Sequence, residues 1–218
     1  MTEQTLRQQI VATALKMNEL RINRGTSGNV SARSGAGFLV TPSGLRYEET
    51  QPEDIVAMTL AGDPDGSRQP STEWRFHRDI YAARPDVGAI VHAHSTFATT
   101  LACAGRAIPA FHYMVAVAGG KDIRCAEYAT FGTQALSDRA LAALEGRKAC
   151  LLANHGMIAV GGSLADALSL AVEVEALAEQ YWRSLQMRTS EETPNLLSDA
   201  EMDVVLEKFR SYGRPEGS

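Results

Sequence analysis

Residues 90–105, IVHAHSTFATTLACAG, place two of the chain's five histidines one residue apart, directly before a segment with a helical pattern. The residues up to His94 are typical of a strand, and those from Ser95 to Gly105 of a capped helix that a glycine ends. Side chains at positions i and i+2 of a strand share a face, so His92 and His94 are predicted to project side by side. That geometry suits a chelating pair, although two histidines satisfied by hydrogen bonds would give the same pattern.

A third ligand would favour the metal interpretation, and His155 is the best candidate. The strand-like segment 150–154, CLLAN, delivers it to a turn in which Gly156 leaves room around the imidazole ring. His77 falls in the middle of a predicted helix beside charged neighbours, whereas spacing alone does not exclude His112. Three neutral imidazoles with an open fourth position describe a catalytic zinc-type site.

The rest of the chain interleaves helical and strand patterns, which predicts one α/β domain whose sheet is covered by helices. Further helices are predicted over residues 3–20, 73–83, 163–186 and 198–210. Further strands are predicted in a hairpin after residue 25, over 54–60, and on both sides of the Asn-His-Gly turn in 150–162. A loop rich in Gly, Pro and Asp separates residue 60 from the helix that starts at 73.

The composition limits the classes of partner and compartment. A net charge of -5 argues against binding to a nucleic-acid backbone, which needs clustered lysine and arginine. Charged residues interrupt the first twenty positions, so no secretory leader is expected, and no apolar run reaches the ~20 residues of a membrane span. The three cysteines lack CxxC spacing, which predicts buried, reduced thiols. We therefore expect a cytoplasmic protein that binds neither nucleic acid nor membrane.

Glu73 opens the helix predicted over 73–83, directly after the breaker-rich loop, with Ser71 and Thr72 as cap residues. A carboxylate is favoured in the first turn by the helix dipole, and most such acids are ordinary surface charges. The surroundings favour a larger role. GTSGN, TPSG and PST are three loops of small and hydroxyl residues, rich in backbone N–H donors of the kind that bind phosphate, although each alone is more often a simple turn.

Seven motifs, in order, carry a resemblance to a known family: GTSGN, TPSG, PSTEWRFH, VHAHS, HYMVAVAGG, YATFGT and ANHG. Together they resemble the class II aldolase and adducin family, most closely its branch that acts on L-fuculose 1-phosphate, over about residues 5–187. The resemblance implies a single domain over 1–218, with a central, mainly antiparallel sheet flanked by helices on both faces. It also implies that residues 188–218 form a C-terminal helix and a mobile tail.

The resemblance implies roles for individual residues. His92, His94 and His155 match the family's zinc ligands, and Glu73 matches its acid/base carboxylate. The residues that match the phosphate-binding loops are Thr26, Gly28, Asn29, Ser43, Gly44, Ser71 and Thr72. Tyr113 matches a tyrosine that reaches the active site of the neighbouring subunit in a cyclic homotetramer. The candidates for contact with the aldehyde end are Phe131, Phe209 and Tyr212.

The activity that the resemblance implies is zinc-dependent, reversible cleavage of a 2-ketose 1-phosphate of the L-fuculose 1-phosphate type to dihydroxyacetone phosphate and a short aldehyde such as lactaldehyde. Other divalent metals could occupy the same ligands. Related aldolases that act on 5-deoxyribulose or 5-methylthioribulose 1-phosphate share these motifs, so the substrate stays open. A pentulose-5-phosphate 4-epimerase is a third interpretation, but there the matching acid is usually aspartate. A non-catalytic assembly domain of the adducin type would lack the zinc histidines.

Overall fold

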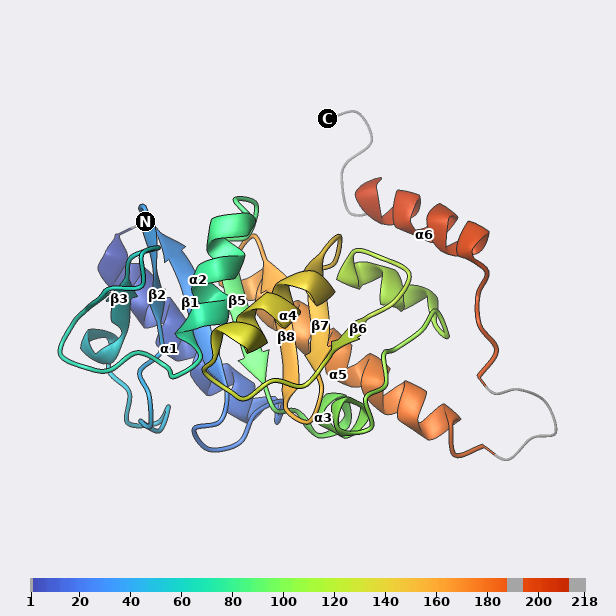
Figure 1. Ribbon diagram of the computed structural model, residues 1–218, viewed down its shortest axis with the longest axis horizontal. Helices are drawn as coiled ribbons and strands as arrows, with labels where there is room; N and C mark the ends of the chain where they lie inside the picture. The colour runs from blue at the N-terminus through green and yellow to red at the C-terminus, as the bar shows by residue number, and fades with distance from the viewer. Residues whose placement is uncertain (1, 188–193, 212–218) are drawn as a thin grey trace.

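One eight-stranded sheet forms the centre of the molecule in the computed structural model, which describes residues 2–187 and 194–211. The strands are β1 Asn29–Ser34, β2 Gly37–Val40, β3 Val56–Met58, β4 Pro64–Asp65, β5 Ala89–Ala93, β6 Arg124–Ala126, β7 Ala149–Leu152 and β8 Gly156–Gly161. They run in the order β4-β3-β2-β1-β5-β8-β7-β6, and β6 with β7 is the parallel pair in an otherwise antiparallel sheet (Figure 1). The prediction of a mainly antiparallel sheet is confirmed.

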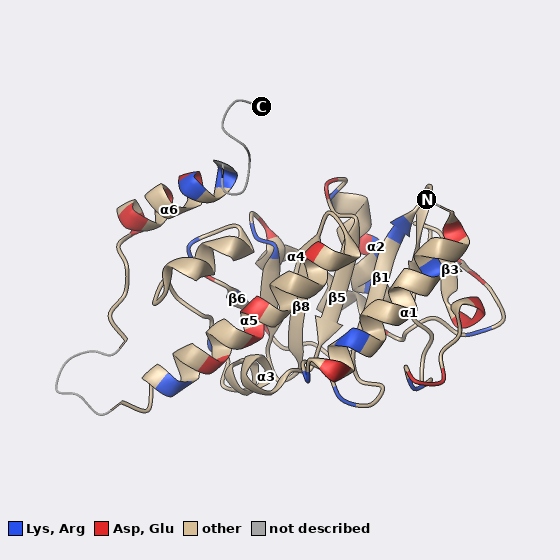
Figure 2. Ribbon diagram, turned by 180° about the vertical axis from the view of Figure 1, so that it is seen from behind, with Lys and Arg blue, Asp and Glu red and all other residues tan. Residues whose placement is uncertain are grey.

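Helices cover both faces of this sheet, as predicted. They are α1 Glu3–Glu19, α2 Trp74–Ala83, α3 Thr96–Cys103, α4 Gln134–Leu144, α5 Leu164–Ser184 and α6 Asp199–Ser211, with 3₁₀ helices η1 Pro52–Asp54 and η2 Tyr113–Ala118. A hydrophobic core lies on each face of the sheet, and neighbouring strand residues point into different cores. Ile90 packs with α2 and α4, and Val91 packs with α1, α3 and α5. Figure 1 shows α2 and α4 over one face, and Figure 2 shows α1 and α5 across the other.

The last described helix, α6, lies at one end of the molecule beside η2 (Figure 1). The backbone N–H of Leu197 donates to the carbonyl oxygen of Ala110 at 2.8 Å, and Met202 is completely buried in this contact. Lys121 forms an ion pair with Asp203 at 2.9 Å. The predicted helix over 198–210 is confirmed, whereas part of the tail predicted to be mobile lies outside the described residues.

Several local predictions need correction. The strand predicted over 54–60 is reduced to β3, because Pro52 starts a 3₁₀ helix that runs to Asp54. No element was predicted between residue 105 and residue 150, yet η2, β6 and α4 lie there, and α4 begins where the Thr133 hydroxyl accepts from the Leu136 N–H. The three cysteines are free, but Cys103 is exposed rather than buried, since it ends α3 at the surface.

The caps of two site-bearing helices also differ from the prediction. Glu73 itself is the N-cap residue of α2, and the Ser71 hydroxyl accepts from the Glu73 N–H at 3.3 Å instead of capping a helix that starts at 73. Ser95 is the N-cap residue of α3 but its side chain caps nothing, because it donates to Glu175 at 2.6 Å. Within the described ranges, no helix combines the length and apolar character that crossing a lipid bilayer requires.

Candidate metal centre and active site

Three histidines and a glutamate converge at one end of the central strands, where β5 ends and β7 turns into β8. Nε2 of His92 lies 3.0 Å from Nε2 of His94 and 3.1 Å from Oε2 of Glu73, and Nε2 of His155 lies 3.1 Å from Oε1 of Glu73. The candidate ligand atoms all lie within 4.8 Å of one another. Among the described residues this is the one group of metal-ligating side chains with such spacing, and it includes neither His77 nor His112.

Local structure explains how the four side chains meet. His92 lies in β5 and His94 directly follows the strand, so the predicted same-face geometry holds for both rings. His155 comes from the turn between β7 and β8, where Asn154 adopts a φ of 57°. Gly28 allows β1 to approach β5, because a Cβ at this position would lie 2.6 Å from the carbonyl oxygen of His92.

Hydrogen bonding prepares the histidines to bind a cation. Nδ1 of His92 lies 2.8 Å from the Met157 carbonyl oxygen; it must therefore donate there, which leaves the Nε2 lone pair facing the cluster. Burial, and after it His92 and His155, lower the pKa of His94 to about 3. The ring of His94 is therefore neutral, which is the form that binds metal.

The charge of Glu73 dominates the field of the cluster. Its side chain is 5% exposed, so it is not the ordinary surface acid that its sequence position suggests. Burial alone would raise the pKa of Glu73, but His92 and His155 outweigh it and hold the pKa well below its usual range. Burial likewise works to lower the pKa of His92, and the Glu73 carboxylate overcomes this and raises it.

These residues fit a divalent metal ion. Oε1 of Glu73 is buried, and although Nε2 of His155 lies 3.1 Å away, the pair lacks regular hydrogen-bond geometry, so this oxygen has room for a cation as a further partner. Three imidazole nitrogens and one carboxylate are the donor types that zinc prefers, and the ionised Glu73 attracts positive charge to the point where they meet. His92, His94 and His155 would hold the ion, with Glu73 in reach of it.

A cleft of about 250 Å³ opens beside the cluster. Its walls include Glu73, His94, His155, Tyr128 and Phe131. A second cavity of about 520 Å³ shares Phe131 and Thr72 with the first and adds Ser43 and Arg75. A substrate could therefore place one end at the histidines and the other at the loops of small residues.

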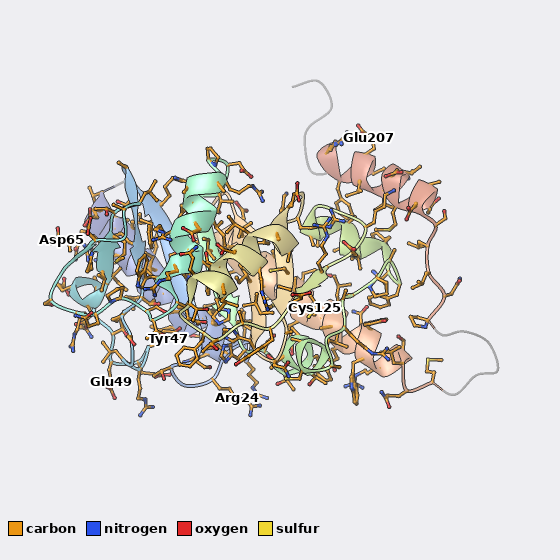
Figure 3. All side chains as sticks on the ribbon, in the orientation of Figure 1. Arg24, Tyr47, Glu49, Asp65, Cys125 and Glu207 are labelled. Carbon is orange, nitrogen blue, oxygen red and sulfur yellow. The ribbon has the colours of Figure 1, made fainter. Side chains whose placement is uncertain are left out.

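Of the residues predicted to bind phosphate, Ser43 and Thr72 line these cavities, and the others lie within two positions of a lining residue in the sequence. The loops 41–44 and 70–72 are joined by backbone hydrogen bonds, because the Ser43 N–H donates to Gln69 and the Ser71 N–H to Thr41, each at 3.0 Å. Gly44 has a φ of 71°, which suits its turn, and Thr26 is exposed. The loop 25–29 reaches the first cavity through Ser27 and is held by Tyr47, whose hydroxyl donates to the Gly28 carbonyl. Figure 3 labels the side chain of Tyr47. The Asn29 side chain, however, donates to Oε2 of Glu73 at 3.0 Å.

The structure separates the candidate aromatic residues. Phe131 is 64% exposed and lines the cleft with Glu73. Tyr113 lines a different cavity of about 630 Å³, where its ring stacks on Phe209 at a centroid distance of 6.4 Å. Within a single chain Tyr113 therefore does not border the metal cleft, and Tyr212 lies outside the described residues.

Comparison with known proteins identifies the family. Residues 8–182 match the model of the class II aldolase and adducin N-terminal domain. The chain belongs to the class II aldolase and adducin family. This class II aldolase is a lyase, and its relatives cover nearly the whole chain. It is 59% identical over 208 residues to the 5-methylthioribulose-1-phosphate/5-deoxyribulose-1-phosphate aldolase of Rhodospirillum rubrum, which covers 95% of this chain and 92% of the relative.

Two further relatives carry another substrate in their names. The L-fuculose phosphate aldolase of Escherichia coli strain K12 is 47% identical over 213 residues, covering 98% of each chain. A solved structure of an L-fuculose 1-phosphate aldolase superposes with a TM-score of 0.89 at 42% identity, covering 94% of this aldolase and 95% of that chain. The family is therefore settled, while the relatives differ in substrate.

Two sets of supporting residues were missed from the sequence. Glu175 of α5 accepts hydrogen bonds from the turn that follows His94, and nothing in its helical pattern signals this. His77 was considered only as a ligand, but it forms buried hydrogen bonds to Asn29 and Ser31. The sequence does contain a signal for the hydrogen bonds of His77. Asn29 and Ser31 lie two positions apart on a strand, so they share a face, and polar side chains there must find hydrogen-bond partners when buried.

Proposed function

We propose that this class II aldolase cleaves a 2-ketose 1-phosphate reversibly to dihydroxyacetone phosphate and a short aldehyde. The observation that carries the proposal is the convergence of three imidazole nitrogens and one buried carboxylate within 4.8 Å, at a cleft. His92, His94 and His155 would hold a divalent cation, for which imidazole ligands favour zinc. When bound, the ion supplies positive charge that polarises the substrate carbonyl and offsets the negative charge that develops as the carbon–carbon bond breaks.

Glu73 would move the proton at C3 of the substrate. In cleavage the C4 hydroxyl loses its proton, the C3–C4 bond breaks, and the electron pair is left on the three-carbon fragment, which is then protonated at C3. In the reverse direction the ionised Glu73 takes that C3 proton from dihydroxyacetone phosphate. His92 and His155 lower the pKa of Glu73 despite its burial and so keep the carboxylate ionised, which is the form that can accept a proton.

The phosphate would bind in the second cavity, against the loops 41–44 and 70–72. Two observations support this site. The two loops are joined by backbone hydrogen bonds, and Arg75, which lines the cavity, carries a positive charge that would attract phosphate. Dihydroxyacetone should therefore bind much more weakly than its phosphate. Calorimetric titration of both compounds measures the difference, and equal affinities would remove the proposed role of the loops.

The physiological substrate is proposed to be 5-deoxyribulose 1-phosphate or 5-methylthioribulose 1-phosphate. The higher identity to a relative of that name, 59% against 47%, favours this assignment. The rings of Tyr128 and Phe131 in the cleft suit the methyl or methylthio end that all three candidate substrates carry, so they support the substrate class without separating its members. L-Fuculose 1-phosphate, which carries an additional hydroxyl at C5, is the second candidate, supported by the superposition at a TM-score of 0.89.

We also propose a cyclic homotetramer in the cytoplasm, in which Tyr113 of one subunit serves a neighbouring cleft as the relay for the C4 hydroxyl proton. Its 51% exposure and its distance from the cleft of its own chain are compatible with that role. A mixture of inactive Tyr113→Phe subunits with inactive Glu73→Gln subunits should regain activity, because some clefts would then combine both native residues. Mixed tetramers without any regained activity would contradict the shared site.

Exchange of the C3 hydrogen of dihydroxyacetone phosphate with solvent tests the role of Glu73. Glu73→Gln should keep its bound metal and lose exchange by a factor of about 10²–10⁴, the usual contribution of a general base. Normal exchange in this variant would refute the assignment. The substrate is tested separately by the order of kcat/KM among the three ketose 1-phosphates.

A further inference from the structure

A line of buried polar side chains leads from Glu73 away from the cleft. Nδ2 of Asn29 lies 3.0 Å from Oε2 of Glu73, and Oδ1 of Asn29 lies 2.5 Å from Nε2 of His77. Nδ1 of His77 lies 2.6 Å from Oγ of Ser31, which lies 2.8 Å from the hydroxyl of Tyr81. None of these five side chains is more than 5% exposed. We call the four side chains that follow Glu73 in this line the support chain: Asn29, His77, Ser31 and Tyr81.

The direction of each hydrogen bond follows from the carboxylate end. An ionised Glu73 can only accept, so Asn29 must turn its NH₂ group toward it and its carbonyl oxygen toward His77. His77 must then carry its proton on Nε2, which leaves Nδ1 to accept from the Ser31 hydroxyl. Ser31 in turn accepts from the hydroxyl of Tyr81. Every donor in the line points toward Glu73.

The neutral state of His77 is required for this order, and the structure provides it. Burial first and the nearby His92 second lower the pKa of His77 to about 3, against a smaller opposite effect of Glu73. A doubly protonated ring could not accept from Ser31, and the other neutral tautomer could not donate to Asn29. The fold therefore selects one of the three forms of the ring.

The support chain is built into the contact between β1 and α2. Asn29 and Ser31 lie two residues apart on one face of β1, while Val30 between them belongs to the opposite core. His77 and Tyr81 lie four residues apart on α2, one helical turn, and meet those two strand residues. Burial of these polar side chains costs desolvation energy that apolar residues would avoid, even though each one is hydrogen-bonded. We therefore infer that they have a function beyond packing.

We propose that His77 is a positioning residue for Glu73, acting through Asn29, with Ser31 and Tyr81 fixing its tautomer. The inference rests on the proposed function, because the group that it holds is the proposed acid/base carboxylate. If the Asn29 amide reversed, its carbonyl oxygen would face Oε2 of Glu73 and repel it. By preventing this reversal, His77 holds the carboxylate beside His92 and His155 without touching the substrate.

Substitution of His77 separates positioning from packing. His77→Phe keeps a buried ring but removes the donor to Asn29, and should lower C3 exchange of dihydroxyacetone phosphate by about 10²-fold, the scale expected for a small misplacement of a catalytic group. His77→Gln places an amide donor near the Nε2 position and should recover most of that loss. In both variants KM should stay within about twofold of the parent value, because the loops 41–44 and 70–72, which are proposed to bind the phosphate, make no hydrogen bond to His77.

Two buried serines provide a matched pair. Ser31 and Ser137 are both 0% exposed, but Ser137 donates to Asp79 at 2.6 Å and lies outside the support chain. Ser31→Ala should lower exchange about tenfold, since His77 loses the group that fixes its tautomer. Ser137→Ala should lose comparable thermal stability and keep the parent exchange rate. Equal C3 exchange rates in the folded, metal-loaded Ser31→Ala and Ser137→Ala proteins would show that the support chain contributes only packing, and would overturn the proposal.

Nitrogen NMR of the wild-type protein gives a readout that does not depend on activity. The ring of His77 should show a protonated Nε2 and an unprotonated Nδ1 throughout the pH range in which the protein stays folded. The other tautomer, or a charged ring at neutral pH, would overturn the inference. If the wild type exchanges no C3 hydrogen at all, the proposed function fails, while the NMR result still decides whether the hydrogen bonds have the inferred order.

Discussion

Replacing Glu175 with alanine should destabilise the turn that carries His94. The carboxylate of Glu175 on α5 accepts three hydrogen bonds, from the Phe97 N–H and the Ala98 N–H at 2.8 Å each and from the Ser95 hydroxyl at 2.6 Å. It thus caps α3 from another helix, at the end where unpaired N–H groups and the helix dipole favour negative charge.

The size of the effect follows from these contacts. Hydrogen bonds to a charged group contribute about 1.5–3 kcal/mol each, but Glu175 is only partly buried and water can replace some of them, so we expect a loss of about 3 kcal/mol. For a chain of this length that corresponds to a decrease in Tm of about 6–12 °C. Because the capped turn begins next to His94, metal affinity should fall as well.

Differential scanning calorimetry and chelator competition measure the two effects. Glu179 on the same helix is the matched control, because it pairs with the exposed Arg183 at 2.6 Å, and Glu179→Ala should cost no more than about 0.5 kcal/mol. Glu175→Gln should fall between the two, since its NH₂ group faces the N–H donors. A Glu175→Ala protein as stable as Glu179→Ala would refute the reasoning.

Three further predictions concern the site and its supporting helix. His155→Ala should weaken metal binding by at least about 10²-fold, more than loss of an outer-shell partner costs, as competition with a chelator would measure. Gly28→Ala should cost about 1–3 kcal/mol and lower metal affinity, because its Cβ would meet the backbone oxygen of His92 at 2.6 Å; Gly35→Ala, where nothing lies within 4 Å, should leave the affinity unchanged. Burial raises the pKa of Asp79, but hydrogen bonds from three side chains, that of the preceding arginine first, lower it overall. The stability it contributes is present above its unfolded pKa of about 3.9 and is lost as the pH falls through the lower folded pKa, so the difference in urea unfolding between wild type and Asp79→Asn should begin to shrink as the pH falls below about 4.

Much of the fold could be predicted because its signals are local. The alternation in VHAH, the Asn-His-Gly turn that ends at Gly156 and the hydroxyl of Ser163 before α5 each act within a few residues. The boundary of β3 could not be predicted, since a 3₁₀ helix takes up Asp54. Helix α4 was overlooked even though Thr133 caps it, because its alanine-rich sequence gives weak contrast between faces.

In the candidate site, too, the features that follow from local sequence could be predicted and those that depend on tertiary packing could not. The pairing of His92 with His94 follows from the period of a strand, and His155 from its turn. The burial of Glu73 could not be predicted, because it depends on how α2 packs against residues far along the chain. The hydrogen bonds of His77 have the same origin, since its partners lie 46 and 48 residues away in sequence.

The most direct test is coupled detection of dihydroxyacetone phosphate from 5-deoxyribulose 1-phosphate, with the protein as purified, after chelation, and after zinc is restored. We predict release that chelation abolishes and zinc recovers, with a higher kcat/KM than for L-fuculose 1-phosphate. If no ketose 1-phosphate is cleaved while the metal is demonstrably bound to the three histidines, the aldolase assignment is contradicted and the 4-epimerase becomes the leading interpretation.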